Sequence, residues 1–232
     1  MIRAVFFDVD FTLIYPGPVF HGEGYQAFCA RHGMAVDPSR FDRAVADALV
    51  LLDGADDSAY DPEIFVAFTR RIIEGLGGRG ETVDACAREI YAEWAACHHF
   101  ELYDEVPSVL RALASRGVRL GLISNSHRCL SSFQTHFELQ GLVSAAVSSP
   151  EQGFMKPHHS IFDTALRLVD VTASEALMVG DNVRQDVEGA LGVGMRAALV
   201  HRGHEPHPRE EELASRGVPV IGSLRELLNL AL

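Results

Sequence analysis

The stretch AVFFDVDFTL, residues 4–13, begins with four apolar residues and then places two carboxylates, Asp8 and Asp10, one position apart. A short apolar run of this kind is typical of a strand that is buried on both faces of a parallel sheet. Two like charges at the end of such a strand repel each other, and burial adds a cost of desolvation. The stretch therefore predicts a buried strand and leaves open what compensates the two charges.

The composition is that of an ordinary globular chain. Of the 232 residues, 47% are hydrophobic and 22% are charged, far from a disordered or fibrous bias. The apolar runs are too short for a membrane span, and the N-terminal residues lack the apolar core of a signal peptide. We therefore expect a cytoplasmic protein with no membrane partner.

Charge and cysteine usage narrow the partners further. The net charge of −12 works against binding to nucleic acid or anionic lipid, because both require positive surface. The four cysteines form no CxxC pair, so we expect them to be reduced rather than to bind zinc. A small anionic substrate remains possible if local cations or a metal ion overcome the negative field.

From Val118 onward, strand-like runs alternate with amphipathic stretches, which predicts parallel strands joined by crossover helices. The final helix begins at Ser223, where Glu226 completes the spacing of a capping box. Thr172 and Glu175 have the same spacing, but a strand follows at once, so we discount that box. The strand-like runs are VRLGLISN (118–125), VSAAVSS (143–149), ALMVGD (176–181), MRAALV (195–200) and VPVIG (218–222).

Residues 16–100 follow a different pattern. Apolar residues recur there at helical spacing, and Asp37-Pro38 and Asp61-Pro62 are typical helix starts. We found no strand-like run between them. The sequence therefore predicts an α/β fold with a Rossmann-like parallel sheet, formed by residues 1–15 and 101–232, and an inserted, mostly helical domain at 16–100.

In such a sheet the carboxyl ends of the strands share one edge, and ligands bind there near the switch point of the topology. Asp8 and Asp10 follow the first strand-like run, Ser124 and Asn125 end the second, and Asp181 follows ALMVG. We therefore expect these residues to lie around one crevice.

Four motifs together resemble those of the haloacid dehalogenase-like (HAD) hydrolase superfamily. Any one of them arises often by chance, but the four occur in the family's order and with plausible separations. The resemblance implies an α/β core whose helical cap is inserted between the first and second motifs. The motifs are DVDFTL (8–13), LISNS (122–126), MKP (155–157) and GDNVRQD (180–186).

The resemblance implies a role for each acidic residue of the motifs. Asp8 is the nucleophile that forms an aspartyl-phosphate, and Asp10 is the acid and base that serves the leaving group and then water. Mg²⁺ is held by the carboxylate of Asp8, the backbone carbonyl of Asp10 and the carboxylate of Asp181. Asp186 supports this site through water or through the metal's ligands.

The resemblance also implies which residues bind the substrate. Lys156 lies between the nucleophile and the phosphoryl oxygens, and it is the only lysine of the chain. Ser124 donates its hydroxyl, and Asn125 its backbone amide, to the same oxygens. Thr12 orients Asp8 or the surrounding water. The family usually has glycine where this chain has Phe11, which puts the geometry of that turn in question.

The residue two positions after the nucleophile favours one branch of the family. Dehalogenation needs no proton for the departing halide, so Asp10 favours a Mg²⁺-dependent phosphatase. A cap admits only substrates that fit whole, so we expect a small phosphorylated metabolite, hydrolysed by a monomer or homodimer. Two alternatives stay open: a 2-haloacid dehalogenase, and a non-catalytic HAD-fold binding protein.

Overall fold

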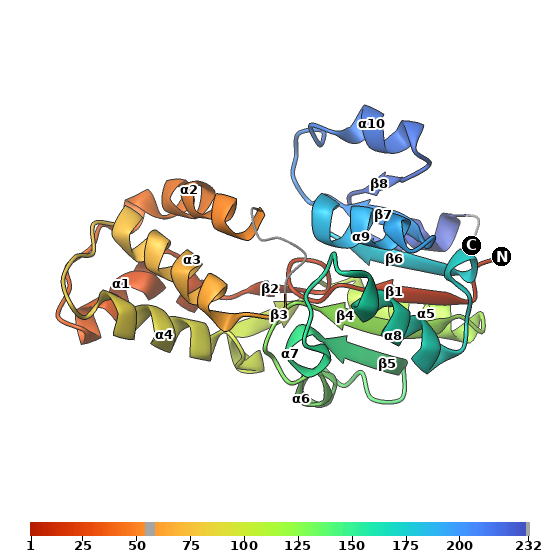
Figure 1. Cartoon of the computed structure of the whole chain (residues 1–232), viewed down its shortest axis with the longest axis horizontal. Helices are drawn as coiled ribbons and strands as arrows, with labels where there is room; N and C mark the ends of the chain where they lie inside the picture. The colour runs from red at the N-terminus through yellow and green to blue at the C-terminus, as the bar shows by residue number, and fades with distance from the viewer. Residues whose placement is uncertain (54–58, 231–232) are drawn as a thin grey trace. The chain divides into compact units, whose positions relative to one another are not determined.

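The computed structural model describes residues 1–53 and 59–230 and divides into two compact units (Figure 1). One unit contains Met1–Tyr15 and Leu102–Leu232, and the other contains Pro16–Glu101. Residues 54–58 of the predicted helical domain and 231–232 of the predicted core lie outside the described residues. Within the described ranges, no helix combines the length and the apolar character needed to cross a membrane.

The first unit is built around a six-stranded sheet in which each pair of neighbouring strands runs parallel. The predicted α/β fold with a parallel sheet is thus confirmed. The strands, in their order across the sheet, are β5 (Val143–Ser148), β4 (Arg119–Ser124), β1 (Ala4–Phe7), β6 (Ala176–Gly180), β7 (Arg196–Val200) and β8 (Val220–Ile221).

All four residues of β1 are buried, as expected for a central strand covered on both faces. Phe6 and Ile123 belong to one hydrophobic core with Ile161 and Phe162, which lie on the helix that connects β5 to β6. The helices of this unit are α5 (Val106–Ser115), α6 (Leu130–His136), α7 (Ser149–Gln152), α8 (His159–Val169), α9 (Gly189–Gly192) and α10 (Glu210–Ser215).

The order of the strands places a topological switch at β1. Along the chain, β4 and β5 extend the sheet on one side of β1, and β6, β7 and β8 then extend it on the other side. Because all of these strands are parallel, the carboxyl ends of β4, β1 and β6 are neighbours at one edge. This is the place where open α/β sheets bind their ligands.

The second unit is helical. Asp37 and Asp61 both cap helix starts as predicted, because their side chains accept hydrogen bonds from the backbone amides of Ser39 and Glu63. Trp94 packs against Phe20, with ring centroids 4.6 Å apart. The helices are α1 (Gly22–Arg31), α2 (Phe41–Asp53), α3 (Pro62–Gly75) and α4 (Val83–Glu93), with 3₁₀ turns at Pro18–Phe20, Pro38–Arg40 and Cys97–His99.

The two stretches that join the units are short strands, which the sequence did not predict. β2 (Ile14–Pro16) pairs with β3 (Phe100–Leu102). The Gly17 amide donates to the His99 carbonyl at 2.7 Å. Three residues are too few for a periodic pattern, and a proline is rare inside a sheet except at an edge, so these strands carry no readable signal.

The discounted capping box is present, so that prediction was wrong. The backbone amide of Thr172 donates to Oε2 of Glu175 at 3.0 Å, and the Thr172 hydroxyl donates to the same oxygen at 2.9 Å. One 3₁₀ turn, Ala173–Glu175, is enough to close the box before β6 begins. The box at Ser223 is also present, and it opens a 3₁₀ helix over Leu224–Asn229.

Candidate active site

Three strand ends bring the predicted residues to one edge of the sheet. Asp8 directly follows β1, Ser124 ends β4 and Asp181 directly follows β6. The Asp8 amide donates to the Val179 carbonyl at 2.9 Å, which continues the pairing of β1 with β6. The backbone before the carboxylate of Asp8 is therefore held by the sheet itself.

Lys156 lies between two of the acids. Its Nζ donates to Oδ1 of Asp8 and to Oδ1 of Asp186, both at 2.6 Å. The other oxygen of Asp186, Oδ2, accepts from the Asn182 amide at 3.0 Å. All three charged residues are at least nine-tenths buried, so these are charge-assisted hydrogen bonds largely shielded from water.

The turn after β6 depends on a close approach of the backbone. A Cβ on Gly180 would lie 2.1 Å from Oδ2 of Asp186, so any larger residue would displace that carboxylate. Asn182 caps the following π-helix, Val183–Glu188, by accepting from the Gln185 amide. This turn therefore fixes Asp186 against Lys156.

Three carboxylates compete for one lysine in this cluster. Oxygens of Asp8, Asp181 and Asp186 lie within 4.8 Å of one another, and within the described residues they form the one group of three or more acidic, histidine or cysteine side chains placed to hold a metal ion. Burial raises the pKa of Asp8 to about 7, with Lys156 opposing the shift and Asp186 adding to it.

Two further pKa shifts show the same imbalance. Desolvation, then the charges of Asp8 and Asp186, raise the pKa of Asp181 well above its ordinary value, although Asp181 is the exposed member of the group and solvent weakens the first cause. Burial disfavours the charged form of Lys156, but the two acids outweigh burial and raise its pKa. A dication bound by oxygen ligands fits this excess of negative charge, and Mg²⁺ prefers such donors.

The second acid has a cation of its own. Nη1 of Arg128 donates to Oδ1 of Asp10 at 2.8 Å. The side chain of Arg128 is completely buried, whereas Asp10 keeps 18% of its side chain exposed. A backbone bridge pairs Asp10 with Ile14. Asp8 and Asp10 are thus neighbours in sequence that contact different cations.

Phe11 shows why the family usually has glycine at this position. Its φ is +63°, in the left-handed region that costs a bulky residue roughly 1–2 kcal/mol. The turn is closed by the Phe11 amide, which donates to the Ile14 carbonyl at 2.7 Å, and by the Leu13 amide, which donates to the Val9 carbonyl at 2.9 Å. Phe11 leaves this turn intact and keeps 45% of its own surface exposed.

Asn125 does more than the backbone contact predicted for it. Its Oδ1 accepts from the Lys156 amide at 2.7 Å, and its Nδ2 donates to the Lys156 carbonyl at 3.0 Å and to Oε1 of Gln185 at 3.1 Å. Ser124 is buried, and its hydroxyl oxygen accepts from the Ser126 amide at 3.1 Å. The side chain of Asn125 therefore ties the loop that carries Lys156 to the turn that carries Asp186.

Thr12 is completely buried, and no hydrogen-bond partner reaches its Oγ1 in the part of the chain that the structure describes. Its carbonyl accepts from Nη2 of Arg202 at 3.0 Å, and Nη1 of Arg202 donates to Oε1 of Glu105 at 2.8 Å. The guanidinium of Arg202 also stacks over the ring of Tyr103, 3.4 Å from its centroid. The predicted orientation of Asp8 by Thr12 thus stays a prediction, whereas Arg202 anchors the end of the turn.

A family comparison supports the reading of these motifs. A model of the family described as haloacid dehalogenase-like hydrolase matches residues 2–194. The chain belongs to the haloacid dehalogenase-like hydrolases. The predictions of the family and of a hydrolase are therefore confirmed.

Relatives of this HAD-like hydrolase include named phosphatases. The glyceraldehyde 3-phosphate phosphatase of Pyrococcus abyssi is 30% identical over 211 residues, which are 88% of this chain and 83% of that protein. The phosphoserine phosphatase of Thermus thermophilus is 32% identical over 165 residues, 68% of this chain and 61% of that protein. A solved HAD-hydrolase, YfnB from Bacillus subtilis, has a TM-score of 0.74 at 17% identity, with 99% of each chain covered. The last likeness shows the fold alone.

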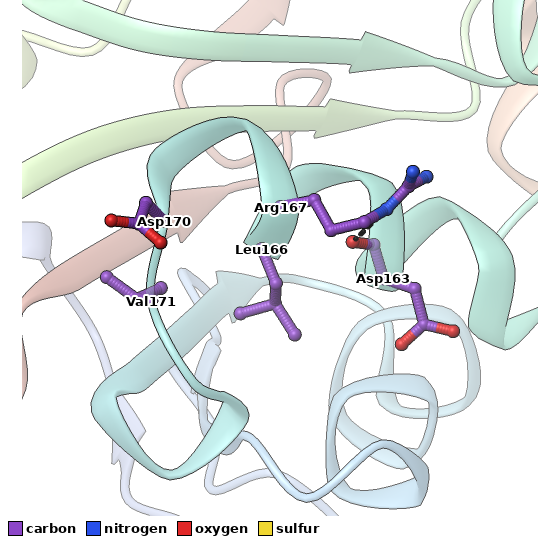
Figure 2. A pocket seen from close by; sticks show the side chains of 5 residues that line it. All are labelled: Asp163, Leu166, Arg167, Asp170 and Val171. Atoms are coloured by element: carbon purple, nitrogen blue, oxygen red, sulfur yellow. Dashed lines mark hydrogen bonds between the residues drawn. The ribbon is translucent and has the colours of Figure 1, made fainter.

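A hollow in the surface of this HAD-like hydrolase lies elsewhere and contains none of the predicted site residues. It is found along α8 and the segment after it, with Asp163, Leu166 and Arg167 on the helix and Asp170 and Val171 beyond its end (Figure 2). An arginine, two acids and two aliphatic side chains line it, and we assign it no role.

Two polar residues of the site escaped the sequence analysis. Arg128 lies in a loop, four residues after Ser124, and its place in the sequence does not predict its contact with Asp10, 118 positions away. Gln185 lies inside a recognised motif, but its contact with Asn125 depends on how two loops meet. A buried arginine contact of this kind could be found only from a structure.

Proposed function

We propose that this HAD-like hydrolase is a Mg²⁺-dependent phosphatase that hydrolyses a small phosphorylated metabolite through an aspartyl-phosphate on Asp8. The observation that carries the proposal is the buried contact of Asp8 with Lys156, beside Asp181 and two residues before a second acid. Mg²⁺, when bound by the carboxylates of Asp8 and Asp181 and the carbonyl of Asp10, supplies the positive charge that lets an anionic nucleophile meet a phosphate.

In the first step an oxygen of Asp8 forms a bond to phosphorus, and the bond between phosphorus and the leaving oxygen breaks. Asp10 donates its proton to that leaving oxygen, so an alcohol departs instead of an alkoxide. Lys156, the Ser124 hydroxyl and the Asn125 amide bind the phosphoryl oxygens, where negative charge is stabilised during transfer.

In the second step Asp10 removes a proton from water, and the water oxygen attacks phosphorus. The bond between phosphorus and Asp8 breaks, inorganic phosphate leaves, and both carboxylates return to their starting state. Asp186 serves by holding Lys156 at 2.6 Å and takes no part in bond changes.

The relatives support a small substrate. Two of them are named for glyceraldehyde 3-phosphate and phosphoserine, both phosphomonoesters of three-carbon molecules. The helical unit Pro16–Glu101 interrupts the core between the first and second motifs, and we assign it the role of a cap that limits substrate size. The enzyme needs neither nucleic acid nor a membrane in this scheme, and it works as a monomer or a homodimer.

The test is a phosphatase assay on p-nitrophenyl phosphate and a panel of small phosphomonoesters, with and without Mg²⁺. We expect metal-dependent turnover by the parent, and a fall of roughly 1,000-fold or more in Asp8→Asn, because an amide is a poor nucleophile. Asp163→Asn is the matched control, since the same change there alters a carboxylate that is 52% exposed and lies on α8.

Two results contradict the proposal. The absence of Mg²⁺-dependent turnover on every phosphomonoester favours a non-catalytic binding protein. Release of halide from a 2-haloacid without metal favours a dehalogenase, so 2-chloropropionate is included in the panel.

A further inference from the structure

Arg128 is the largest side chain of the described residues that is completely buried. It lies in the loop between β4 and α6, and its Nη1 donates to Oδ1 of Asp10 at 2.8 Å. Removing a guanidinium from water costs several kcal/mol unless charged or polar partners replace the water. The burial of Arg128 therefore has to be compensated by its contacts, which is not required of an exposed arginine.

The loop that carries Arg128 is fixed to the strand that ends in Ser124. The Ser126 amide donates to the Ser124 hydroxyl oxygen at 3.1 Å, and the Arg128 amide donates to the Ser126 hydroxyl oxygen at 3.3 Å. Helix α6 begins two residues later, at Leu130. Arg128 is thus held by the same strand end that presents Ser124 to the site.

The contact with Arg128 restrains the carboxylate of Asp10. The backbone of Asp10 is held by its bridge to Ile14, and Arg128 holds Oδ1, so rotation of the carboxylate is restricted. The side chain of Asp10 keeps 18% of its surface exposed, whereas Asp8 is buried against Lys156. Lys156 thus contacts Asp8, and Arg128 contacts the more exposed Asp10.

An arginine suits this task better than a lysine. A guanidinium stays protonated throughout the accessible pH range, so it holds an acid in place without exchanging protons with it. Its planar group also loses less freedom for each hydrogen bond formed than a flexible ammonium does. The chain uses its one lysine on the nucleophile and an arginine on the second acid.

We propose that Arg128 is a positioning residue for Asp10, which holds that carboxylate in the orientation for proton transfer to the leaving oxygen. This inference rests on the proposed phosphatase activity. Its consequence is specific: Arg128 matters most for substrates whose leaving group needs a proton. A p-nitrophenolate leaves readily as an anion, whereas an alkoxide does not.

The experiment compares kcat/KM for p-nitrophenyl phosphate with kcat/KM for an alkyl monoester, taken as the better of glycerol 3-phosphate and phosphoserine. This constant reports only the steps up to departure of the leaving group, so a slow second step does not obscure it. In Arg128→Met we expect a fall of about 100-fold on the alkyl ester and of less than about 10-fold on the aryl ester. Arg128→Lys restores part of the alkyl activity, because it keeps a donor and a positive charge near Asp10.

Asp10→Asn provides the second measurement. It should show the same preference for the aryl ester, and adding Arg128→Met to it should cause little further loss on the alkyl ester, because both changes disable one proton transfer. Thermal melting of each variant checks folding. If Arg128→Met does not fold, Arg128→Lys alone still tests the aryl-to-alkyl ratio.

Three outcomes overturn the inference. An equal fall on both esters assigns Arg128 to phosphoryl binding or to folding, and unchanged kinetics removes any role. A full additional loss in the double variant shows that Arg128 acts independently of Asp10. Each of these requires a parent that hydrolyses both esters, so they differ from failure of the proposed function, in which the parent itself is inactive.

Discussion

Gly180→Ala tests how tightly the turn after β6 holds the site. The added Cβ would lie 2.1 Å from Oδ2, 2.2 Å from Cγ and 2.6 Å from Cβ of Asp186. Ordinary contact begins at about 3.4 Å, so the carboxylate has to move by about 1 Å. Its bonds to Lys156 and to the Asn182 amide, 2.6 and 3.0 Å long, do not survive that shift unchanged.

The cost can be worked from these contacts. Overpacking a close site costs roughly 1–3 kcal/mol, and a lost hydrogen bond to a charged group costs roughly 1.5–3 kcal/mol. Alanine suits a strand better than glycine and returns a few tenths of this, so we expect a loss of about 3 kcal/mol. In a chain of this length that lowers the melting temperature by roughly 6–12 °C. Displacement of Lys156 by about 1 Å should lower kcat/KM about 100-fold.

The assay combines thermal unfolding followed by circular dichroism with hydrolysis of p-nitrophenyl phosphate. Gly192→Ala is the matched control, because no atom lies within 4 Å of its added Cβ and the residue belongs to α9, where alanine is favoured. Its melting temperature should be unchanged or slightly raised.

A double variant identifies the cause. In an Asp186→Ala background the clashing carboxylate is gone, so Gly180→Ala should cost little further stability. The reasoning is refuted if Gly180→Ala behaves like Gly192→Ala, or if its full cost persists when Asp186 has already been removed.

Two further predictions concern metal and charge. Mg²⁺ at about 100 times its dissociation constant should stabilise the parent by about 2.7 kcal/mol in unfolding experiments, and chelation of the metal should reverse the stabilisation. Asp181→Asn should abolish this stabilisation, whereas Asp163→Asn should retain it. Equal stabilisation of the two variants argues against the site. Glu105→Gln should cost about 1.5 kcal/mol at neutral pH, the low end for a lost hydrogen bond to a charged group, since Arg202 keeps 20% of its side chain exposed. Burial is the largest single influence and opposes the charge on Glu105, but the hydrogen bond and charge of Arg202, together with backbone hydrogen bonds such as that from Leu224, outweigh it and hold the pKa of Glu105 below its usual 4.5. Its stabilisation is therefore present above the unfolded pKa and is lost as the pH falls through the folded one. The difference between parent and variant in denaturant titrations should therefore shrink as the pH falls below the usual 4.5. A difference that stays constant with pH contradicts this.

The sheet and its functional edge were predictable because each depends on local features. Buried strands read as short apolar runs, and parallel strands place their ends together whatever the details of the helices. That is why Asp8, Ser124 and Asp181, far apart in sequence, could be assigned to one edge. The structure brings Lys156 and Asp186 to the same place.

What the sequence did not predict depends on how separate loops meet. Arg128 and Gln185 contact residues of other loops, and no periodicity encodes such a meeting. β2 and β3 are stabilised mainly by each other, so neither carries a pattern of its own. The capping box at Thr172 was discounted for lack of room, but a 3₁₀ turn needs only three residues. At position 11 the sequence showed that phenylalanine replaces the glycine usual in the family. The left-handed backbone conformation of Phe11 was seen only in the structure.

The ribbon formed by β2 and β3 has a consequence for how this protein can change. The chain leaves the sheet and comes back at adjacent points, with Gly17 and His99 joined by one backbone hydrogen bond of 2.7 Å. A segment whose ends already touch can be lengthened, shortened or exchanged without pulling on the strands beside it. If the helical unit limits the substrate as proposed, its residues can therefore change substrate preference during evolution while Asp8 and Asp10 stay in place after β1.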